Sequence, residues 1–431
     1  MTRVSLPTLV VAAAATVLTA CNSSGGGSAA IENRDAYFDS LSSSVNANVE
    51  AGASAMAGAS ASGSSAPGFV STDDSTARVL PHLEVFSQWS TRLDTRSGDT
   101  TTGFDIDTFL DNLEEYGTLT DTSSGLLFQP DSSRICTGDI DVNRCTAVAN
   151  ASSIEFTQSG EQSGSVVFQF ETQEVFILEF SQNSLAGTWV LQGMKAFLEA
   201  VDPDANNLPN TFNGRFKAKV EATGTNSGRI TTSVPEAINV GDDTTDYQLN
   251  LGQTGTLLMV EGNDDLGTGS VSVDVSALDL RLAEEDDPGV IWDLAVPAFS
   301  FDMTGDNKGT EDNSDDDMTV TASLASPGIV LKKGSEDQLT VDAFTLDASM
   351  TSGVLTFNEA LNFAMMAIED ATTNELDVQI ASGTELQSTD DCNGKPGTDV
   401  LAGSVDITVS ENDTATIDVS ASAGACFEED Q

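Results

Sequence analysis

Apolar and polar residues alternate with a period of two from about Ile154 to the C-terminus. Val271, Val273 and Val275, for example, are separated by single polar residues, and clusters of Gly, Asn and Asp divide one such run from the next. This alternation is typical of half-buried β-strands, and the short connections favour antiparallel pairing. The sequence therefore predicts a mainly β fold. We expect a large, mostly antiparallel sheet, arranged as a meander, a wrapped sheet or a sandwich, with a few helices that are mostly N-terminal.

Two stretches inside this region lose the two-residue period and are expected to be helical, Leu191 to Val201 and about Asn358 to Ala371. Two more helices are expected before the strands, over about residues 73–93 and 105–116. Asp and Ser side chains that can cap helices stand at the start of both N-terminal stretches.

Three segments of the chain share a similar sequence pattern. In the first of them the apolar phase slips between Ala277 and Leu278. A slip of this kind reverses the faces of a strand unless a bulge absorbs it. Long repeated strands would explain the echoes, and chance recurrence of Val, Asp, Ser and Thr explains them as simply. The segments are Val273-Asp-Val-Ser-Ala-Leu-Asp279, Val296-Pro-Ala-Phe-Ser-Phe-Asp302 and Val341-Asp-Ala-Phe-Thr-Leu-Asp347.

The first twenty residues have the pattern of an export signal. An apolar run too short to span a bilayer follows Arg3 and ends in Leu18-Thr19-Ala20-Cys21. This ending resembles the lipobox of the bacterial lipoproteins. The resemblance implies cleavage before Cys21, acylation of that cysteine and, with Asn22 rather than Asp after it, anchoring in the outer membrane. The alternative is an ordinary signal peptide with an incidental cysteine.

The composition suggests three regions. Residues 1–20 form the signal peptide. Residues 21–74 are rich in Ser, Gly and Ala and are expected to form a tether that carries at most one helix, between Ile31 and Val49. Residues 75–431 are expected to form the β-rich domain, either undivided or subdivided near residue 240.

The chain is strongly acidic. It has 17 Lys and Arg against 68 Asp and Glu, a formal net charge of −51, which becomes −52 when Arg3 leaves with the signal peptide. Binding to nucleic acid or to anionic headgroups needs a basic face, so the composition argues against both. The expected partners are the membrane, through the lipid anchor, and another envelope protein or an apolar ligand.

Four cysteines follow Cys21, an even number that favours disulfides in an exported chain. Three pairings are open. We favour the local one, Cys136 with Cys145 and Cys392 with Cys426, because each pair flanks a plausible loop.

Candidate chemistry is sparse. His82 is the single histidine, and no nucleophile elbow, Walker loop, zinc motif or dinucleotide fingerprint is present, so the sequence does not predict an enzyme. Calcium is the most credible cofactor because it binds oxygen ligands at alternate positions. Asp202, Asp204 and Asn206 have that spacing, and a solvated acidic turn would have it equally.

These observations leave three functions open. The first is a membrane-anchored envelope lipoprotein with a non-catalytic structural or binding role. The second is a carrier of an apolar, lipid-like ligand in a curved sheet, in which Phe168, Phe170, Phe176 and Phe180 would line a cavity; an ordinary core would use them in the same way. The third is a hydrolase that uses two carboxylates.

Overall fold

The computed structural model describes residues 31, 33–44, 47–48, 113–136, 142–201, 209–242, 247–263, 267–283, 290–306, 319–369, 372–392, 395–412 and 414–428. The chain divides into two compact units, residues 1–53 with 68–236 and residues 54–67 with 237–431. The division lies within one strand, close to the subdivision that the sequence suggested near residue 240.

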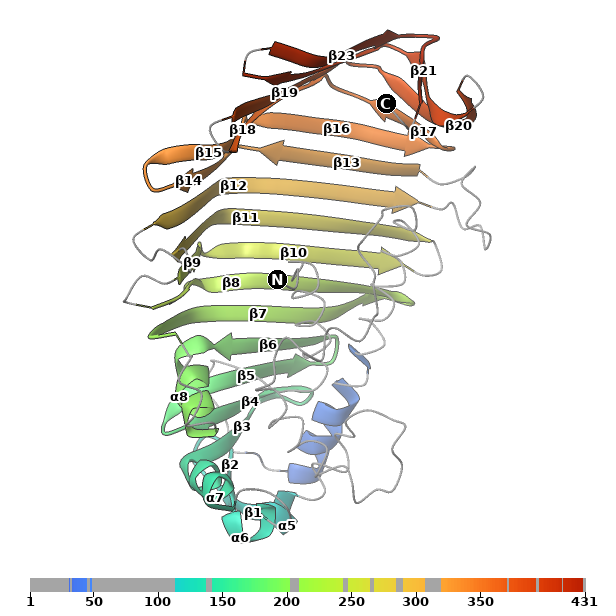
Figure 1. Ribbon diagram of the computed structural model, residues 1–431. Helices are drawn as coiled ribbons and strands as arrows, with labels where there is room; N and C mark the ends of the chain where they lie inside the picture. Colours follow the sequence, from blue (N-terminus) through green and yellow to red (C-terminus); the bar gives the residue numbers. More distant parts are fainter. Residues whose placement is uncertain are drawn as a thin grey trace. The chain divides into compact units, whose positions relative to one another are not determined.

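Unit 1 is an antiparallel sheet accompanied by helices (Figure 1). Strands β1 to β7 pair with their sequence neighbours, each pair antiparallel. The helix of residues 191–201 has the predicted bounds. The elements are a helix of residues 34–44, α5 (Leu113–Tyr116), β1 (Gly117–Asp121), β2 (Leu126–Pro130), α6 (Ser132–Ile135), α7 (Val142–Ala151), β3 (Ser152–Gly160), β4 (Ser163–Phe170), β5 (Gln173–Ser181), β6 (Ser184–Val190), α8 (Leu191–Val201), β7 (Thr211–Gly224) and the first part of β8 (Ser227–Gly241).

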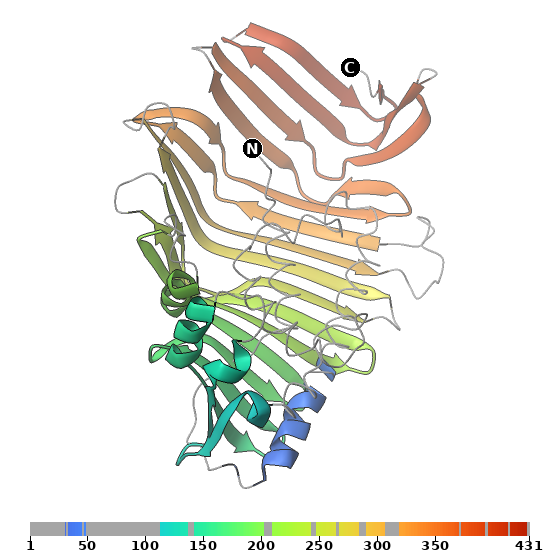
Figure 2. The ribbon, with the colours of Figure 1, turned by 60° about the horizontal axis from the view of Figure 1, so that its bottom comes forward.

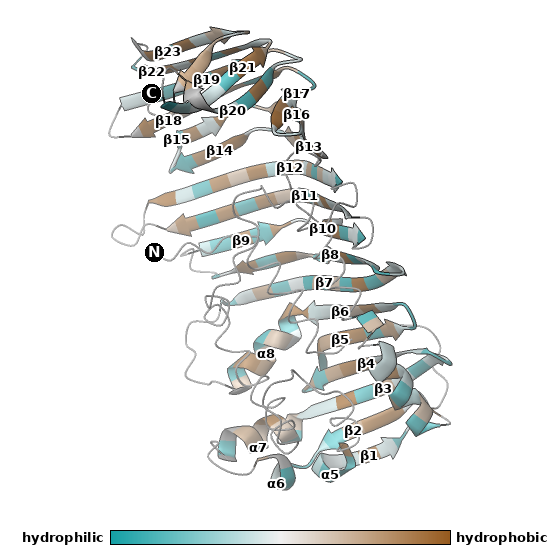
Figure 3. Cartoon of the chain, turned by 90° about the vertical axis from the view of Figure 1, so that its right-hand side faces the viewer, coloured by the Kyte–Doolittle hydropathy of each residue, from teal (hydrophilic) through white to brown (hydrophobic). Residues whose placement is uncertain are grey.

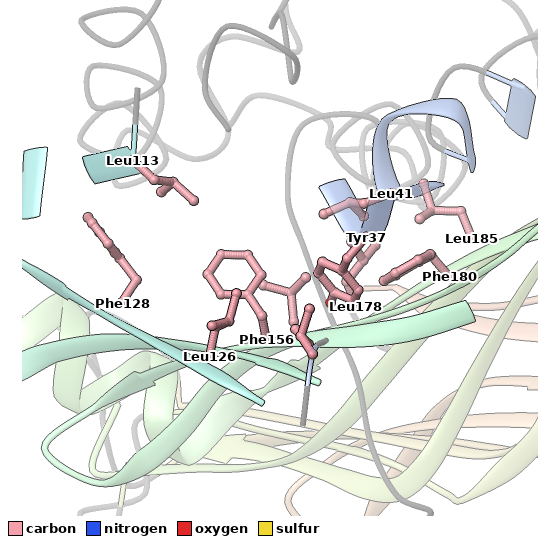
Figure 4. Packing of buried hydrophobic residues seen from close by; sticks show 11 residues of the cluster. Tyr37, Leu41, Leu113, Leu126, Phe128, Phe156, Leu178, Phe180 and Leu185 are labelled. Carbon is pink, nitrogen blue, oxygen red and sulfur yellow. The ribbon is translucent and has the colours of Figure 1, made fainter. Parts of the chain in front are cut away.

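The helix of residues 34–44 belongs to the core of unit 1. Tyr37 and Leu41 are buried, and Tyr37 packs edge-to-face on Phe180 with ring centroids 5.5 Å apart (Figure 4). Arg34 forms ion pairs with Glu114 and Asp121 at the edge of the sheet. The helix expected inside a free tether is therefore packed on the sheet, because its apolar stripe finds a matching apolar face there.

The phenylalanines considered for a ligand cavity pack in an ordinary core. Phe168 and Phe170 meet Phe197 of α8 with ring centroids 5.4 and 5.7 Å apart, and Phe176 lies in the same cluster. Phe180 lies with Tyr37 in the neighbouring cluster. In the described part of unit 1, these rings are packed against the helices and against one another as core side chains.

In its described residues unit 2 consists of strands, and these confirm the predicted mainly β, antiparallel fold. Every strand pairs antiparallel with its neighbours. The strands are the end of β8, β9 (Tyr247–Leu251), β10 (Thr254–Asn263), β11 (Thr268–Ala283), β12 (Ile291–Asp306), β13 (Thr319–Ser326), β14 (Ile329–Lys333), β15 (Glu336–Val341), β16 (Phe344–Thr351), β17 (Val354–Phe357), β18 (Leu361–Glu369), β19 (Thr372–Ile380), β20 (Glu385–Cys392), β21 (Lys395–Ala402), β22 (Ser404–Glu411), β23 (Thr414–Ser422) and β24 (Cys426–Glu428).

The expected helix at Asn358 to Ala371 is wrong, because β18 occupies Leu361–Glu369. Its sequence, LNFAMMAIE, contains good helix formers. The strand pairs with β15 on one side and β19 on the other, and these ladders outweigh the local preference.

Along most of unit 2, two strands lie end to end as the two halves of one longer strand, which is interrupted near its middle. The interruptions divide the sheet into two half-sheets. Half-sheet A comprises β10, the first half of β11, the second half of β12, and β13, β16, β17, β20, β21 and β24. Half-sheet B comprises β9, the remaining halves of β11 and β12, and β14, β15, β18, β19, β22 and β23.

The phase slip between Ala277 and Leu278 is present in the structure, and no β-bulge absorbs it. Strands β11 and β12 are continuous (Figures 1 and 2), and their pairing runs from Thr268↔Asp306 to Ala283↔Ile291 without a register shift. Apolar positions nevertheless change from odd to even numbers along β11, and from even to odd along β12. Since neighbouring residues of a strand point to opposite faces, the apolar side chains of half-sheets A and B lie on opposite faces of these two strands.

At the C-terminal strands the two half-sheets share one core. Phe344 of β16 packs on Phe363 of β18 with ring centroids 5.1 Å apart. Leu361 and Val378 from half-sheet B lie in the same buried cluster as Phe357 from half-sheet A. This core closes the end of unit 2, whereas the apolar residues of β9, β12 and β14, and those of β11 apart from the buried Val275, remain half-buried or exposed.

Candidate ligand-binding surface

Five leucines form a row across five neighbouring strands of half-sheet B. Cross-strand register places Leu249 beside Leu280, Leu280 beside Leu294, Leu294 beside Leu331 and Leu331 beside Leu339. We call these five residues the leucine row. Paired residues of an antiparallel sheet point to the same face, so the row is a continuous aliphatic strip. Figure 3 shows the apolar positions recurring along β11 and β12.

Every member of the leucine row is half-buried rather than buried. A leucine fully removed from water contributes about 1.5–3 kcal/mol, so each of these side chains leaves part of that free energy unrealised. Solvated apolar strips of this kind, continuous over several strands, mark surfaces that bind a partner or a ligand.

A second row of side chains lies beside the leucine row, at the ends of the same strands. Tyr247, Leu282, Trp292 and Lys333 are successive register partners and share the face of the leucine row. We call them the end row. Leu282 is 43% exposed, and the Lys333 ammonium lies 5.1 Å from the centroid of the Trp292 ring. The strip therefore ends in two aromatic rings and a cation.

The opposite face of the same strands is polar. Arg281, Asp293 and Lys332 are register partners there, and the Arg281 Nε lies 3.4 Å from Asp293 Oδ1. Lys332 pairs with Asp337 at 3.3 Å. Half-sheet B thus has one aliphatic face and one charged face at this end.

Tyr247 stays protonated at neutral pH. The pKa of its hydroxyl is raised, first by partial burial and second by the negative charge of Asp242. The ring can therefore contribute an apolar surface and a neutral hydroxyl to the end row.

A separate hollow of about 550 Å³ lies where the strands of unit 2 are interrupted. Small side chains make up much of its wall, among them Ala298, Pro327, Ala343 and Ala360, with Asp274 contributing a carboxylate. None of these residues belongs to the leucine row, so the hollow is a different feature.

Both disulfides form in the favoured local pairing. Cys136 is bonded to Cys145 and Cys392 to Cys426, with Cα atoms 5.6 and 5.7 Å apart. The first bond ties α7 to the segment after α6, and the second ties β20 to β24. They stabilise the two units and lie outside the leucine row.

The remaining predicted site residues lie outside the described residues. These are the lipidation candidate Cys21, the single histidine His82, and the calcium candidates Asp202, Asp204 and Asn206. Among the residues that the structure does describe, no three His, Cys, Asp or Glu side chains gather as metal ligands would. No described helix has the length and apolar character needed to span a membrane.

Sequence reasoning missed the leucine row, although its signal was present. Leu278, Leu280 and Leu282 alternate with charged residues, as do the apolar residues of β9 with polar ones. Alternation identifies each strand but not the register that aligns one leucine with the next. Comparisons with protein-family models, with curated proteins and with solved structures found no match.

Proposed function

We propose that this chain is a lipid-anchored protein of the bacterial cell envelope that binds an apolar ligand of the acyl-chain class and does not catalyse a reaction. The observation that carries the proposal is the leucine row, a continuous aliphatic strip that is half-buried on five strands. The signal-like first twenty residues and Cys21 supply the proposed anchor, in the outer membrane.

The composition of the strip favours a hydrocarbon chain over a protein partner. Protein interfaces are enriched in Tyr, Trp, Phe, Met and Arg, which supply most of their binding energy. The leucine row contains none of these residues, and its flank on the side away from the end row is again aliphatic, formed by Leu251, Leu278 and Val296. A flexible acyl chain matches a smooth aliphatic strip because it needs no directional contacts.

The dimensions also suit an acyl chain. Neighbouring strands are about 4.8 Å apart, so five strands span roughly 19 Å from the first leucine to the last. An extended long acyl chain has a similar length, and each methylene that it buries contributes about 0.8 kcal/mol.

The proposal is tested with 1-dodecanol and the full mature chain carrying Cys21→Ala, which avoids detergent. We expect saturable binding by calorimetry. Leu280→Gln, in the middle of the leucine row, should weaken it at least about tenfold, since a polar amide would replace a central apolar contact. Leu401→Gln is the matched control, because Leu401 is 44% exposed and lies on β21, outside the row. Absence of binding, or equal binding by both variants, would refute the proposed surface.

The anchor is tested separately. In a bacterial host, wild-type protein should fractionate with membranes and Cys21→Ala should be released as soluble protein. If the variant remains in the membrane fraction, the lipid on Cys21 is not the anchor.

A further inference from the structure

The hollow of about 550 Å³ borders the aliphatic surface that contains the leucine row. On three strands a second aliphatic residue lies two positions from a leucine of the row, on the same face, and a small residue that lines the hollow follows two positions further on. These series are Leu294–Val296–Ala298, Leu331–Ile329–Pro327 and Leu339–Val341–Ala343. Four residues of a strand span about 13 Å, so a hydrocarbon chain that begins in the hollow reaches the leucine row over an aliphatic surface.

The wall of the hollow that lies further from the leucine row is polar. Cross-strand register places Asp274 of β11 beside Ser300 of β12. The same row continues through Ala325 of β13 to Thr345 of β16. All four side chains are exposed and line the hollow. The hollow thus has an aliphatic border on one side and a row with a carboxylate and two hydroxyls on the other.

Asp274 is the charged residue among the described side chains that line the hollow. In the described part of unit 2, the ion pairs between strands join Arg281 to Asp293 and Lys332 to Asp337, and none includes Asp274. An ionised carboxylate is a strong acceptor for the N–H groups of a cation. The formal net charge of −51 also favours a cation over an anion at this place.

We propose that the hollow binds the primary ammonium headgroup of a single-chain amphiphile whose hydrocarbon chain extends over the aliphatic surface to the leucine row. In this arrangement the Asp274 carboxylate accepts N–H hydrogen bonds from the headgroup, and the Ser300 hydroxyl beside it accepts another. The small side chains of Ala298, Pro327 and Ala343 leave room for the first carbons of the chain. The inference rests on the proposed function, and it adds the class of the headgroup and the direction in which the ligand lies.

The test compares three probes with the same hydrocarbon chain, dodecylammonium, 1-dodecanol and dodecanoate, on the full mature Cys21→Ala chain, below the concentrations at which they form micelles. Calorimetry at about 0.15 M salt, where the Debye length is about 8 Å, keeps the contribution of distant acidic residues small. We expect dodecylammonium to bind at least about tenfold more tightly than the alcohol, the advantage of a charge-assisted hydrogen bond. In Asp274→Asn, which keeps the size of the side chain, this advantage should disappear while dodecanol binding stays unchanged.

Two further variants make the result specific. Asp279→Asn removes the same charge from the same strand, but Asp279 is exposed on the opposite face of β11, so the advantage should persist. Asp274→Glu keeps a carboxylate at the hollow and should retain the advantage.

The headgroup inference is overturned if the wild type binds amine and alcohol equally or binds dodecanoate most tightly. It is also overturned if the advantage of the amine survives in Asp274→Asn or is lost in Asp279→Asn. If Asp274→Asn loses dodecanol as well, Asp274→Glu decides, and its failure to bind the amine more tightly than the alcohol overturns the inference. Failure of the wild type to bind any of the three probes instead refutes the proposed function itself.

Discussion

Gly403 lies against the buried side chain of Thr384 where the two half-sheets of unit 2 meet, and a Cβ atom on Gly403 would lie 2.3 Å from the Thr384 hydroxyl oxygen. That hydroxyl donates to the carbonyl of Ala381 at 2.6 Å and accepts from the Ser404 N–H at 3.2 Å. The contact therefore joins the β19–β20 connection to the β21–β22 connection.

Gly403→Ala should destabilise unit 2 far more than Gly353→Ala. Both glycines have a positive φ, +77° and +75°, so an alanine at either position costs about 1–2 kcal/mol of backbone strain. At Gly353 a Cβ would meet nothing within 4 Å, whereas at Gly403 it would also displace Thr384. We expect an additional loss of about 1–3 kcal/mol for Gly403→Ala, from the broken hydrogen bonds of a buried hydroxyl. Urea unfolding of both variants measures the difference, and similar midpoints would contradict it.

The Tyr37 ring, rather than its hydroxyl, should hold the helix of residues 34–44 on unit 1. The hydroxyl donates to the carbonyl oxygen of Ser165 at 2.9 Å, with that of Thr157 at 3.2 Å, while the ring is 1% exposed in an aromatic cluster. We expect Tyr37→Phe to lower the free energy of unfolding by about 1 kcal/mol and Tyr37→Ala by about 3–5 kcal/mol. Denaturant unfolding checks both values. Equal losses in the two variants would assign the stabilisation to the hydroxyl instead.

The two disulfides should contribute differently to the free energy of unfolding. Their cysteines are 9 residues apart in Cys136–Cys145 and 34 apart in Cys392–Cys426. The chain-entropy model predicts that the longer loop contributes about 1 kcal/mol more, because its closure restricts the unfolded chain more strongly. Replacing each pair by alanines and measuring unfolding of the corresponding unit tests this order. A greater loss from removing the short loop would show that native-state effects exceed the entropy term.

Asp131 should make the start of α6 sensitive to acid. Its pKa lies below the ordinary 3.8 mainly because the Ser133 hydroxyl donates to it at 2.6 Å; the Ser133 N–H and the Arg134 guanidinium add to the effect. A lowered folded-state pKa means that the unfolded chain binds the proton more readily. The stabilisation of the folded state by the Asp131 carboxylate is therefore complete above its ordinary pKa of 3.8. It is lost as the pH falls through the lower folded-state pKa. An NMR titration should show the pKa rising in Ser133→Ala and unchanged in Ser132→Ala. A pKa that stays low in Ser133→Ala would contradict the assignment.

Much of the fold could be predicted because its signals are local. Two-residue alternation indicated the strands of both units, and Leu191–Val201 proved helical within its predicted bounds. Short loops favoured the pairing of Cys136 with Cys145 and of Cys392 with Cys426. The phase slip after Ala277 was also visible in the sequence, but whether a bulge absorbs it depends on the neighbouring strand.

The candidate site could not be predicted, because it exists only across strands. The row that joins Leu249 to Leu339 spans residues ninety positions apart in the chain, and a shift of one residue in any pairing would turn a leucine to the other face. The same dependence explains the error at Leu361–Glu369, where the ladders to β15 and β19 overrode a helical preference.

By itself the sequence determined the alternation and the acidic charge and favoured the local disulfides, since each follows from composition or short spacing; it also predicts an export signal that ends at Cys21. The tertiary structure alone decided which apolar residues are buried and which form a strip. The helix of residues 34–44 and the phenylalanines of β4 and β5 pack into a core, while the leucine row and the Lys333–Trp292 pair stay at the surface. That division depends on register and on what covers each face, and both arise from contacts between residues distant in the sequence.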